Sequence, residues 1–388
     1  MALLSQFDDW HDDITAWRRD LHAHPELKYD THRTSAFVAD RLRAFGCDEV
    51  VEGIGRTGVV GLIHGQQGLQ ARTIGLRADM DALPIQEATG APHASVVPGK
   101  MHACGHDGHT AMLLGAARYL AETRAFSGTV AVIFQPAEEG GAGAAAMVED
   151  GLMTRFGISE VYGLHNSPLL PFGQFAIRSG PFYAAVDSFR IDVRGRGGHA
   201  ARPHQTVDTT LAASAIVMAL QSIVARNTDP QQPVVVSVTA FHTEGDAFNV
   251  IPDGATLRGT LRSFDGTVRD ATLTRMAEVI EATAQAYGAT ARLHQEEEPY
   301  PVMVNHGAET EHCVAAATQV VGTCDDNAPR TTGGEDFAYM LEACPGAYIQ
   351  LGIGHGPGLH HPAYDFNDAI IPIGCSYWVT LAEARLAP

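Results

Sequence analysis

Apolar side chains recur along the first part of the chain with the period of a helix and then of buried strands. Between residues 12 and 47 they return every three or four positions, which marks one helix face, and Pro25 interrupts the pattern. We therefore expect two helices joined by a short turn. Beyond them helical and strand patterns alternate, which predicts an α/β domain. The expected strands lie at 59–63, 73–77 and 129–134, with a helix at 110–122.

The pattern changes after Pro181. Alternating apolar and polar residues at 188–193 are followed by two helical and two further strand patterns. A group that has its own sheet and two helices predicts a small α+β module of ferredoxin-like type, inserted into the first domain. The acidic run at 296–298 is the expected return linker. The expected catalytic domain therefore comprises residues 1–183 and 297–388, and the inserted module comprises 184–296.

Length and composition support two globular domains and restrict the class of partner. The 388 residues exceed the roughly 250 to 300 at which single cores stop growing. A net charge of -19 argues against nucleic acid as a partner, because phosphate binding needs a basic surface. No stretch approaches the roughly 18 unbroken apolar residues of a membrane helix, and the chain start lacks the parts of a secretory signal. We therefore expect a cytoplasmic protein without a membrane partner.

Four potential metal ligands lie within the segment MHACGHDGH, at residues 101–109. Cys104 and His106 are separated by one glycine, so they would not share a helix face, and a loop is expected to bring them together. A thiol beside an imidazole at this spacing is a natural pair of ligands for a divalent metal. For any single histidine a capping or hydrogen-bonded role is the alternative. The four residues are His102, Cys104, His106 and His109.

Two adjacent glutamates, Glu138 and Glu139, follow the expected strand at 129–134. Open α/β sheets bind ligands beyond the carboxyl ends of their strands. One glutamate can therefore bind metal while the other takes a proton from a water molecule that the metal activates. In isolation, a solvated glutamate pair would be an equally good interpretation.

Two more histidine positions end apolar stretches, at His165 and at the pair His360 and His361. With the cysteine, His106 and a glutamate, they provide one thiolate, three imidazoles and one carboxylate. Such a set is sufficient for two ions that share a bridging water. Asp79 and Asp81 end an expected strand, and we expect them to orient an imidazole rather than to bind metal themselves.

Three polar residues stand out in the inserted module. His199 follows a double glycine, and Asn249 and Arg262 supply an amide and a guanidinium. Such a set can hold an oxyanion and clamp a carboxylate. A turn asparagine and a surface arginine are the alternative interpretation.

Ten motifs in order resemble those of the M20 family of peptidases and amidohydrolases. The resemblance is to the branch of hippurate hydrolases, N-acyl-amino-acid amidohydrolases and plant auxin-conjugate hydrolases, and it spans nearly the whole chain. The motifs are RRDLHAHPEL, GLRADMDALPIQE, MHACGHDGH, FQPAEEG, GLHN, GRGGHAARPH, FNVIPD, GTLRSF, GGEDFA and LHHP.

The resemblance implies a catalytic domain of the dinuclear-metal aminopeptidase type, in which Glu138 is the general base. This glutamate would activate the bridging water and later protonate the leaving amine. Zinc or manganese is expected, and cobalt or nickel also suits the ligands. Relatives often carry LHNP or HSP where this chain has two histidines, and alignment on the proline favours His360. The implied ligands are Cys104, His106, Glu139, His165 and His360.

The resemblance also implies roles for residues outside the ligand set. His199, Asn249 and Arg262 would come from the small module, which in this family pairs two subunits, so that His199 can serve the active site of a partner. Asp79 and Asp81 would lie near the metals, and Gly334 near the substrate pocket.

We therefore expect a homodimeric enzyme that hydrolyses the amide bond of an N-acyl amino acid, such as an N-benzoyl or N-acetyl conjugate. A deacetylase of an N-acetyl-diamino acid would use the same residues. A metal-binding homologue without activity and a thiol protease that uses Cys104 are the alternatives from other classes.

Overall fold

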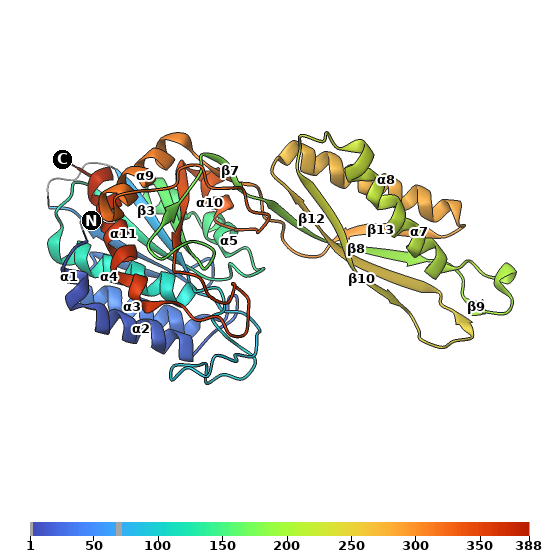
Figure 1. The fold of residues 1–388 in the computed structure, drawn as a ribbon, viewed down its shortest axis with the longest axis horizontal. Coiled ribbons are helices and arrows are strands. Elements are labelled where there is room, and N and C mark those ends of the chain that lie inside the picture. The colour runs from blue at the N-terminus through green and yellow to red at the C-terminus, as the bar shows by residue number, and fades with distance from the viewer. Residues whose placement is uncertain (1–2, 67–71, 388) are drawn as a thin grey trace. The chain divides into compact units, whose positions relative to one another are not determined.

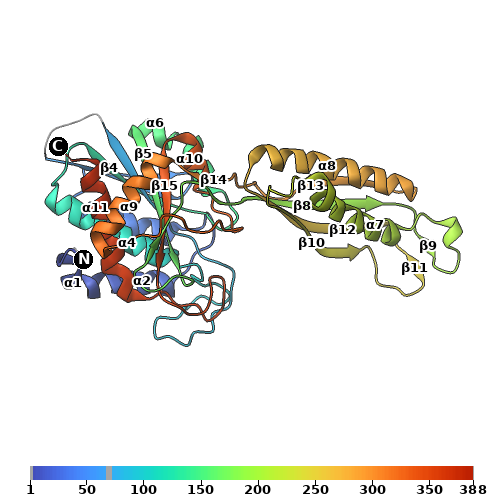
Figure 2. The same ribbon diagram turned by 45° about the horizontal axis from the view of Figure 1, so that its top comes forward.

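The computed structural model describes residues 3–66 and 72–387 of the chain. It divides into two compact units, drawn in Figures 1 and 2. Unit 1 comprises Met1–Phe182, Val304–Pro329 and Asp336–Pro388, and unit 2 comprises Tyr183–Met303 and Arg330–Glu335. Unit 2 is thus inserted into unit 1 along the chain.

Unit 2 extends further than the predicted 184–296. Tyr300 and Val186 each donate a backbone N–H to the carbonyl of the other, both at 2.9 Å, so the chain still pairs with this unit at residue 300. The acidic run at 296–298 is therefore not the return linker. A run of charges has the composition of a linker, and only the backbone pairing shows that this run belongs to unit 2.

A second return segment, Arg330–Glu335, also belongs to unit 2. The backbone N–H of Ala184 donates to the carbonyl of Thr331 at 3.1 Å. Within this segment a Cβ on Gly334 would lie 2.2 Å from Cγ2 of Val186. Close packing inside unit 2 thus explains why position 334 is a glycine.

The core of unit 1 is a seven-stranded sheet. Its central strands β4, β3, β5 and β15 run parallel, whereas β1, β2 and β6 pair antiparallel at the two sides. In spatial order the strands are β1 (Glu49–Ile54), β2 (Gly58–His64), β4 (Thr129–Gln135), β3 (Thr73–Asp79), β5 (Ile158–Ser167), β15 (Gly346–Gly352) and β6 (Phe175–Ala176).

Helices cover both faces of this sheet, because its central strands are apolar on both sides. In β15, Ala347, Ile349 and Leu351 join the large core, whereas Tyr348 between them contacts Phe337 beside α10. The large core is covered by α3 (His32–Phe45), α4 (His106–Thr123), α9 (Gly307–Val321) and α11 (Ile371–Arg385), with α1 (Gln6–Asp9) and α2 (His11–Ala23) packed outside them. The other face carries α5 (Gly143–Glu149), α6 (Leu152–Phe156) and α10 (Ala338–Ala343).

Parallel strands end at one edge of the sheet, so the residues at their carboxyl ends come together. Asp79 and Gln135 are the last residues of β3 and β4, and they are partners in the register. His165 lies near the end of β5. The loop before α4 reaches the same edge, because the His106 ring bonds to the carbonyl of Asp81.

Unit 2 is a four-stranded antiparallel sheet that carries two helices, and its chain order and strand order are ferredoxin-like. A short pair, β9 with β11, extends from it. In spatial order the strands are β10 (Val234–Thr243), β12 (Gly254–Ser263), β8 (Ala185–Arg194) and β13 (Thr290–Gln295). The helices are α7 (Thr209–Ser222), which continues as the π-helical turn η2 (Ile223–Asn227), and α8 (Gly266–Ala286); the short strands are β9 (Gly198–His199) and β11 (Val250–Ile251).

Short elements complete the described chain: the strands β7 (Gly180–Tyr183) and β14 (Met303–Asn305), which pair with each other, and the turns η1 (Pro203–Gln205) and η3 (Asp368–Ile370). The segment Thr209–Asn227 is long and apolar enough to cross a membrane by length and composition alone, which the sequence reading did not single out. One face of it packs on the sheet through Ala212, Ile216 and Leu220. Core helices of globular domains share these properties.

Candidate metal centre

Gly105 allows the chain to turn between Cys104 and His106. Its φ is +92°, and a Cβ at this position would lie 2.3 Å from Oδ1 of Asn166, so only glycine fits. Cys104 lies on the expected loop. His106 and His109, however, lie in the first turn of α4, which begins earlier than the predicted 110. The thiol and the His106 imidazole therefore converge from a loop and a helix start.

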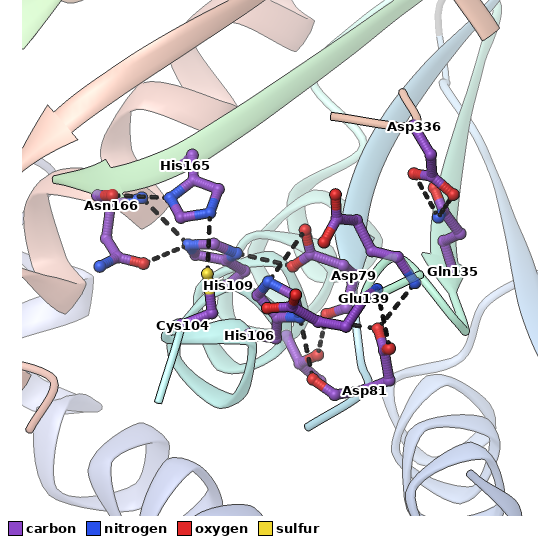
Figure 3. A network of polar contacts seen from close by, with 12 residues as sticks. Asp79, Asp81, Cys104, His106, His109, Gln135, Glu139, His165, Asn166 and Asp336 are labelled. Carbon is purple, nitrogen blue, oxygen red and sulfur yellow. Dashed lines mark hydrogen bonds and ion pairs between the residues drawn. The ribbon is translucent and has the colours of Figure 1, made fainter. Parts of the chain in front are cut away.

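The implied ligands gather in two groups that share the thiol. Figure 3 shows four of these ligands, Cys104, His106, Glu139 and His165. In each group the ligand atoms lie within 4.8 Å of one another. Cys104 Sγ is 3.5 Å from His165 Nε2, and His360 Nε2 is 3.1 Å from Glu139 Oε1. Cys104 would therefore contribute to the holding of both ions of a two-metal site. The groups are Cys104 with His106 and His165, and Cys104 with Glu139 and His360.

The ring contacts of His106 and His165 leave the same nitrogen available to a metal. Nδ1 of His106 donates to the Asp81 carbonyl at 2.9 Å, and Nδ1 of His165 donates to the Asn166 carbonyl at 2.6 Å. These bonds assign the tautomer in which Nε2 carries the lone pair. Among the described residues, Nε2 of His106 is buried and has no hydrogen-bond partner. A buried ring nitrogen that has no hydrogen-bond partner and lies within 4.8 Å of other potential ligand atoms fits a metal ion, and His106, unlike His102, meets both conditions.

The two aspartates contact the segments that carry the implied ligands. Both carboxylate oxygens of Asp81 accept backbone N–H groups, from Glu138 at 2.9 Å and from Glu139 at 3.1 Å. Asp79 Oδ1 accepts a hydrogen bond from Nδ1 of His109 at 2.6 Å. The glutamate turn and the helix start are thus fixed against the end of β3.

His102 and His109 differ from the implied ligands. Both ring nitrogens of His109 are engaged, since Nε2 lies 2.6 Å from Oδ1 of Asn166. Both ring nitrogens of His102 are buried without a partner in the described part of the chain. Burial is the main cause that lowers the pKa of His102 to about 3, so it is neutral. Sequence spacing alone could not separate these two from His106.

Carboxylates dominate the electrostatics of the site. Burial acts to lower the pKa of His106, but Asp79 and Asp81 raise it to about 10, which favours a proton on the imidazole of the metal-free chain. A metal ion would replace that proton, because the same carboxylates favour any positive charge at this position. Burial, with Glu139 and Glu138 nearby, holds the pKa of the Cys104 thiol well above its usual value. A thiol in this environment becomes a thiolate when a metal cation offsets the neighbouring charges.

The pKa values of His165 and Asp81 are also shifted by burial. Burial and the neighbouring His109 hold the pKa of His165 well below its usual value, so its imidazole is neutral, as a metal ligand must be. Burial raises the pKa of Asp81. A metal ion would reverse that preference by favouring the charged carboxylate.

Of the two adjacent histidines, His360 lies at the metal-ligand groups and His361 points away from them. His360 contacts Glu139, whereas Nδ1 of His361 accepts the backbone N–H of Ala363 at 3.0 Å and its side chain is exposed. His360 has a φ of +63°, a conformation that costs energy for a residue with a side chain. Its contacts must therefore hold it in place.

The sequence reading missed a buried polar network beneath the glutamate turn. Arg77 donates to Asp79 Oδ2 at 2.8 Å, to Gln135 Oε1 at 2.8 Å and to Asp336 Oδ1 at 3.1 Å. Burial acts to raise the pKa of Asp79, but His106 and Arg77 hold it well below its usual value. A charged residue inside an apolar strand was the signal in the sequence.

The three residues of unit 2 are placed differently. His199 and Asn249 are exposed side chains on neighbouring strand ends, where Ala200 N–H donates to the Asn249 carbonyl at 3.0 Å. Arg262 is half-buried on β12, and its Nη1 is buried without a hydrogen-bond partner among the described residues. Burial lowers the pKa of Arg262, which Asp187 opposes.

Comparison with known proteins identifies the family. The sequence profile of peptidase family M20/M25/M40 matches residues 75–384. This chain belongs to the M20 family. It is 40% identical to a hippurate hydrolase of Campylobacter jejuni, over 98% of this chain and 99% of that one. It is 39% identical to an N-acetylcysteine deacetylase of Bacillus subtilis, over 96% of this chain and 97% of that one, and 39% identical to an IAA-amino acid hydrolase of Arabidopsis thaliana, over 97% and 85%.

Solved structures of M20 proteins share the fold. The Bacillus subtilis YXEP protein, described as a dinuclear metal binding peptidase from the M20 family, superposes with a TM-score of 0.84 at 36% identity, over 98% of this chain and 99% of that one. A putative aminohydrolase of Staphylococcus aureus gives a TM-score of 0.89 at 32% identity, over 99% of each chain. The M20 chain described here is therefore a metallo-hydrolase of the amidohydrolase branch.

Proposed function

We propose that this M20 enzyme hydrolyses the amide bond of N-acyl amino acids, such as N-benzoyl or N-acetyl conjugates, with the help of two divalent metal ions. The observation that carries the proposal is the convergence of two ligand groups on Cys104, with Glu138 beside them. Relatives named hippurate hydrolase and N-acetylcysteine deacetylase cleave bonds of this class.

Glu138 is the proposed general base. It is buried, and its carboxylate lies within 4.8 Å of the ligand atoms of His106 and Glu139. Bound ions would polarise the amide carbonyl and lower the pKa of a water molecule. Glu138 would take a proton as the water oxygen attacks the carbonyl carbon. It would then give that proton to the amide nitrogen as the carbon–nitrogen bond breaks, which releases the acid and the amino acid.

Unit 2 supplies the proposed substrate contacts. The unpartnered Nη1 of Arg262 suits a substrate carboxylate, because a charge-assisted hydrogen bond offsets the cost of burying the guanidinium. His199 and Asn249 carry donors that suit the oxyanion formed during attack. Gly334 keeps the role of a residue near the substrate pocket as part of this proposal, beside the packing role described above.

The proposed ions are zinc or manganese, and cobalt or nickel also suits the ligands. A thiolate favours softer ions such as zinc, whereas the imidazoles and the carboxylate accept all four. Metal content after purification, followed by activity after each metal is returned to the stripped protein, would distinguish them.

We further propose a homodimer formed through unit 2. The sheet ends at β10, a ten-residue strand rich in valine, and long apolar edge strands readily pair with another chain. Leu211 and Met218 are exposed on α7, and Val235 and Phe241 are exposed on β10. The replacement Val235→Lys should yield monomers in light scattering. If His199 serves a partner's site, mixed dimers of Glu138→Gln and His199→Ala chains should regain activity that neither parent has.

Acetyl substrates give the second candidate, because two relatives are named as deacetylases of N-acetylcysteine. An N-acetyl-diamino acid would need the same catalytic residues. A thiol protease is disfavoured, since burial holds the pKa of Cys104 far above the range of a reactive thiolate.

The proposal is tested by a hydrolysis screen of N-acetyl, N-benzoyl and indole-acetyl amino acids after individual metals are returned to the stripped enzyme. We expect turnover that chelation abolishes. No turnover with any metal would contradict the proposal, and turnover that survives chelation would favour the thiol mechanism. Turnover of N-acetyl-diamino acids alone would select the second candidate.

A further inference from the structure

Helix α2 buries a polar stripe beside its apolar one. Arg18 and His22 lie four residues apart on the same helix face and are both fully buried. Arg18 Nε donates to Oδ1 of Asp368 at 2.7 Å, and Nη2 donates to Oδ2 of the same carboxylate at 2.9 Å. This two-bond contact fixes the position of the guanidinium in its plane.

The same guanidinium reaches two more carboxylates. Nη1 of Arg18 is 3.3 Å from Oδ1 of Asp365 and 3.5 Å from Oδ2 of Asp107. Asp107 is fully buried, and Nδ1 of His22 also donates to its Oδ2 at 2.8 Å. Arg18 therefore joins carboxylates from two segments that lie more than 250 residues apart in the sequence.

Each of these segments carries an implied metal ligand. Asp107 directly follows His106 in the first turn of α4. Asp365 and Asp368 follow the loop that carries His360. The two ligands belong to different groups around Cys104, so Arg18 connects the two halves of the metal centre without contacting either ligand in the described structure.

Several other contacts anchor the His360 loop, including the buried ring of Phe366, which packs against Gly108 of α4, and the Pro362 carbonyl, which accepts the Ala88 N–H at 2.8 Å. The His360 N–H donates to the Ala103 carbonyl at 2.8 Å, and the Tyr364 hydroxyl accepts from Nδ2 of Asn166 at 2.7 Å. Because His360 has a positive φ, a loop that is released at one end would relax away from this conformation. At the end that follows Tyr364, Arg18 supplies the charged contacts, to Asp365 and Asp368, beside the buried ring of Phe366.

A buried guanidinium is a costly way to gain stability, since apolar residues of similar size often replace buried ion pairs without loss. The presence of such a group is better explained by the fixed relative position that it gives to the two segments it joins. We propose that Arg18 is a positioning residue that fixes the His360 loop against the start of α4, and so sets the spacing of the two metal-ligand groups. This inference rests on the proposed pair of metal ions.

The test measures metal binding rather than activity. The full-length chain, stripped of metal, is titrated with Co²⁺ by calorimetry, and the thiolate absorption band is followed in parallel. A His360→Ala chain identifies the binding step that depends on the loop. In Arg18→Met we expect that step to weaken by about 10-fold or more, as is typical when a group that supports a ligand is removed, while the other step is unchanged.

Two further variants keep the test decisive. Arg18→Lys retains the charge but cannot form the two-bond contact, so it should show the same selective loss. Asp368→Asn weakens the two-bond contact by changing the carboxylate instead of the guanidinium. It replaces Arg18→Met in the test if that variant fails to fold. Arg19→Met is the matched control: Arg19 is a half-exposed neighbour that also bonds Asp368, at 2.9 Å, but reaches no residue of α4 in the described structure.

The outcomes separate this inference from the proposed function. Unchanged binding in both Arg18→Lys and Asp368→Asn would overturn the positioning role, and so would equal weakening of both steps, which would indicate general loosening. Fewer than two Co²⁺ ions bound by the unaltered chain would instead count against the proposed metal pair.

Discussion

Most of the implied metal ligands of unit 1 are buried and held by many contacts, whereas two of the three candidate polar residues of unit 2 are exposed. In unit 1, Cys104, His106 and His165 are buried, and each imidazole is oriented by a backbone carbonyl. In unit 2, His199 and Asn249 are exposed on a short strand pair. Charged and reactive groups that must bind metal benefit from a rigid, water-poor site. The proposed substrate contacts His199 and Asn249 are accessible from solvent.

This contrast indicates that substitutions in the two units should separate the binding of metal from the use of substrate. Changes in unit 1 should alter metal content, chemistry or folding. Changes at the exposed residues of unit 2 should alter turnover or substrate affinity alone, because an exposed side chain contributes little to stability.

The largest effect is expected for Glu138→Gln. Loss of the general base should lower kcat by about 10²- to 10⁴-fold, while metal content stays the same because the amide is not an implied ligand. Steady-state kinetics and metal analysis of the same preparation measure both. The exposed Glu149→Gln in the same unit is the control. A Glu138→Gln enzyme with normal kcat would remove Glu138 from the mechanism.

The next effect is expected at the exposed strand pair. His199→Ala and Asn249→Ala should each lower kcat by about 10²- to 10³-fold, the usual cost of losing an oxyanion donor. Their melting temperature and metal content should match the unaltered enzyme. His204→Ala, also exposed and close in sequence, should be neutral. A loss of metal from His199→Ala would break the contrast between the two units.

A smaller effect is expected for Arg262→Met. One charge-assisted hydrogen bond is worth about 1.5 to 3 kcal/mol, so KM for an N-benzoyl amino acid should rise by roughly 10- to 100-fold with little change in kcat. The amide analogue of the substrate, which lacks the carboxylate charge, should lose less. Arg258→Met, an exposed neighbour on β12, is the matched control. Equal losses with acid and amide would argue against a carboxylate clamp.

The last effect leaves the kinetic constants aside and concerns the pH dependence of stability in unit 1. Burial acts to lower the pKa of His22, but Asp107 raises it from 6.5 to about 9. A raised pKa gives stability that is complete below pH 6.5 and is lost as pH rises through 9. The loss should be on the order of 3 kcal/mol, at about 1.36 kcal/mol per pKa unit.

Urea unfolding of the metal-free chain between these pH values measures that loss. In His22→Gln the slope of stability against pH should largely disappear. In His199→Ala the slope should persist, because that side chain is exposed and belongs to unit 2. A slope that survives in His22→Gln would assign the pH dependence to another group.

Elements with a clear period were predictable from the sequence. The helices on both sides of Pro25, the strands β2, β3 and β4, and the long helices of unit 2 form where the pattern places them. Helix α4 starts four residues before the predicted 110, because Gly105 and polar residues begin it and no apolar stripe marks its first turn. Helix α9 and strands β1 and β13 were not predicted, since their exposed residues weaken the pattern.

The sequence by itself determined the kinds of chemical group that this protein carries and the family to which it belongs, since ordered motifs keep their residue types whatever the conformation. Tertiary structure alone decided which of them meet. It separated His106, with a free Nε2, from His109, whose nitrogens are both engaged, and His360 from His361. It also revealed Arg18 and Arg77, whose partners lie far away in the sequence. Spacing along a chain fixes local geometry, but contacts between distant segments depend on how the whole core packs.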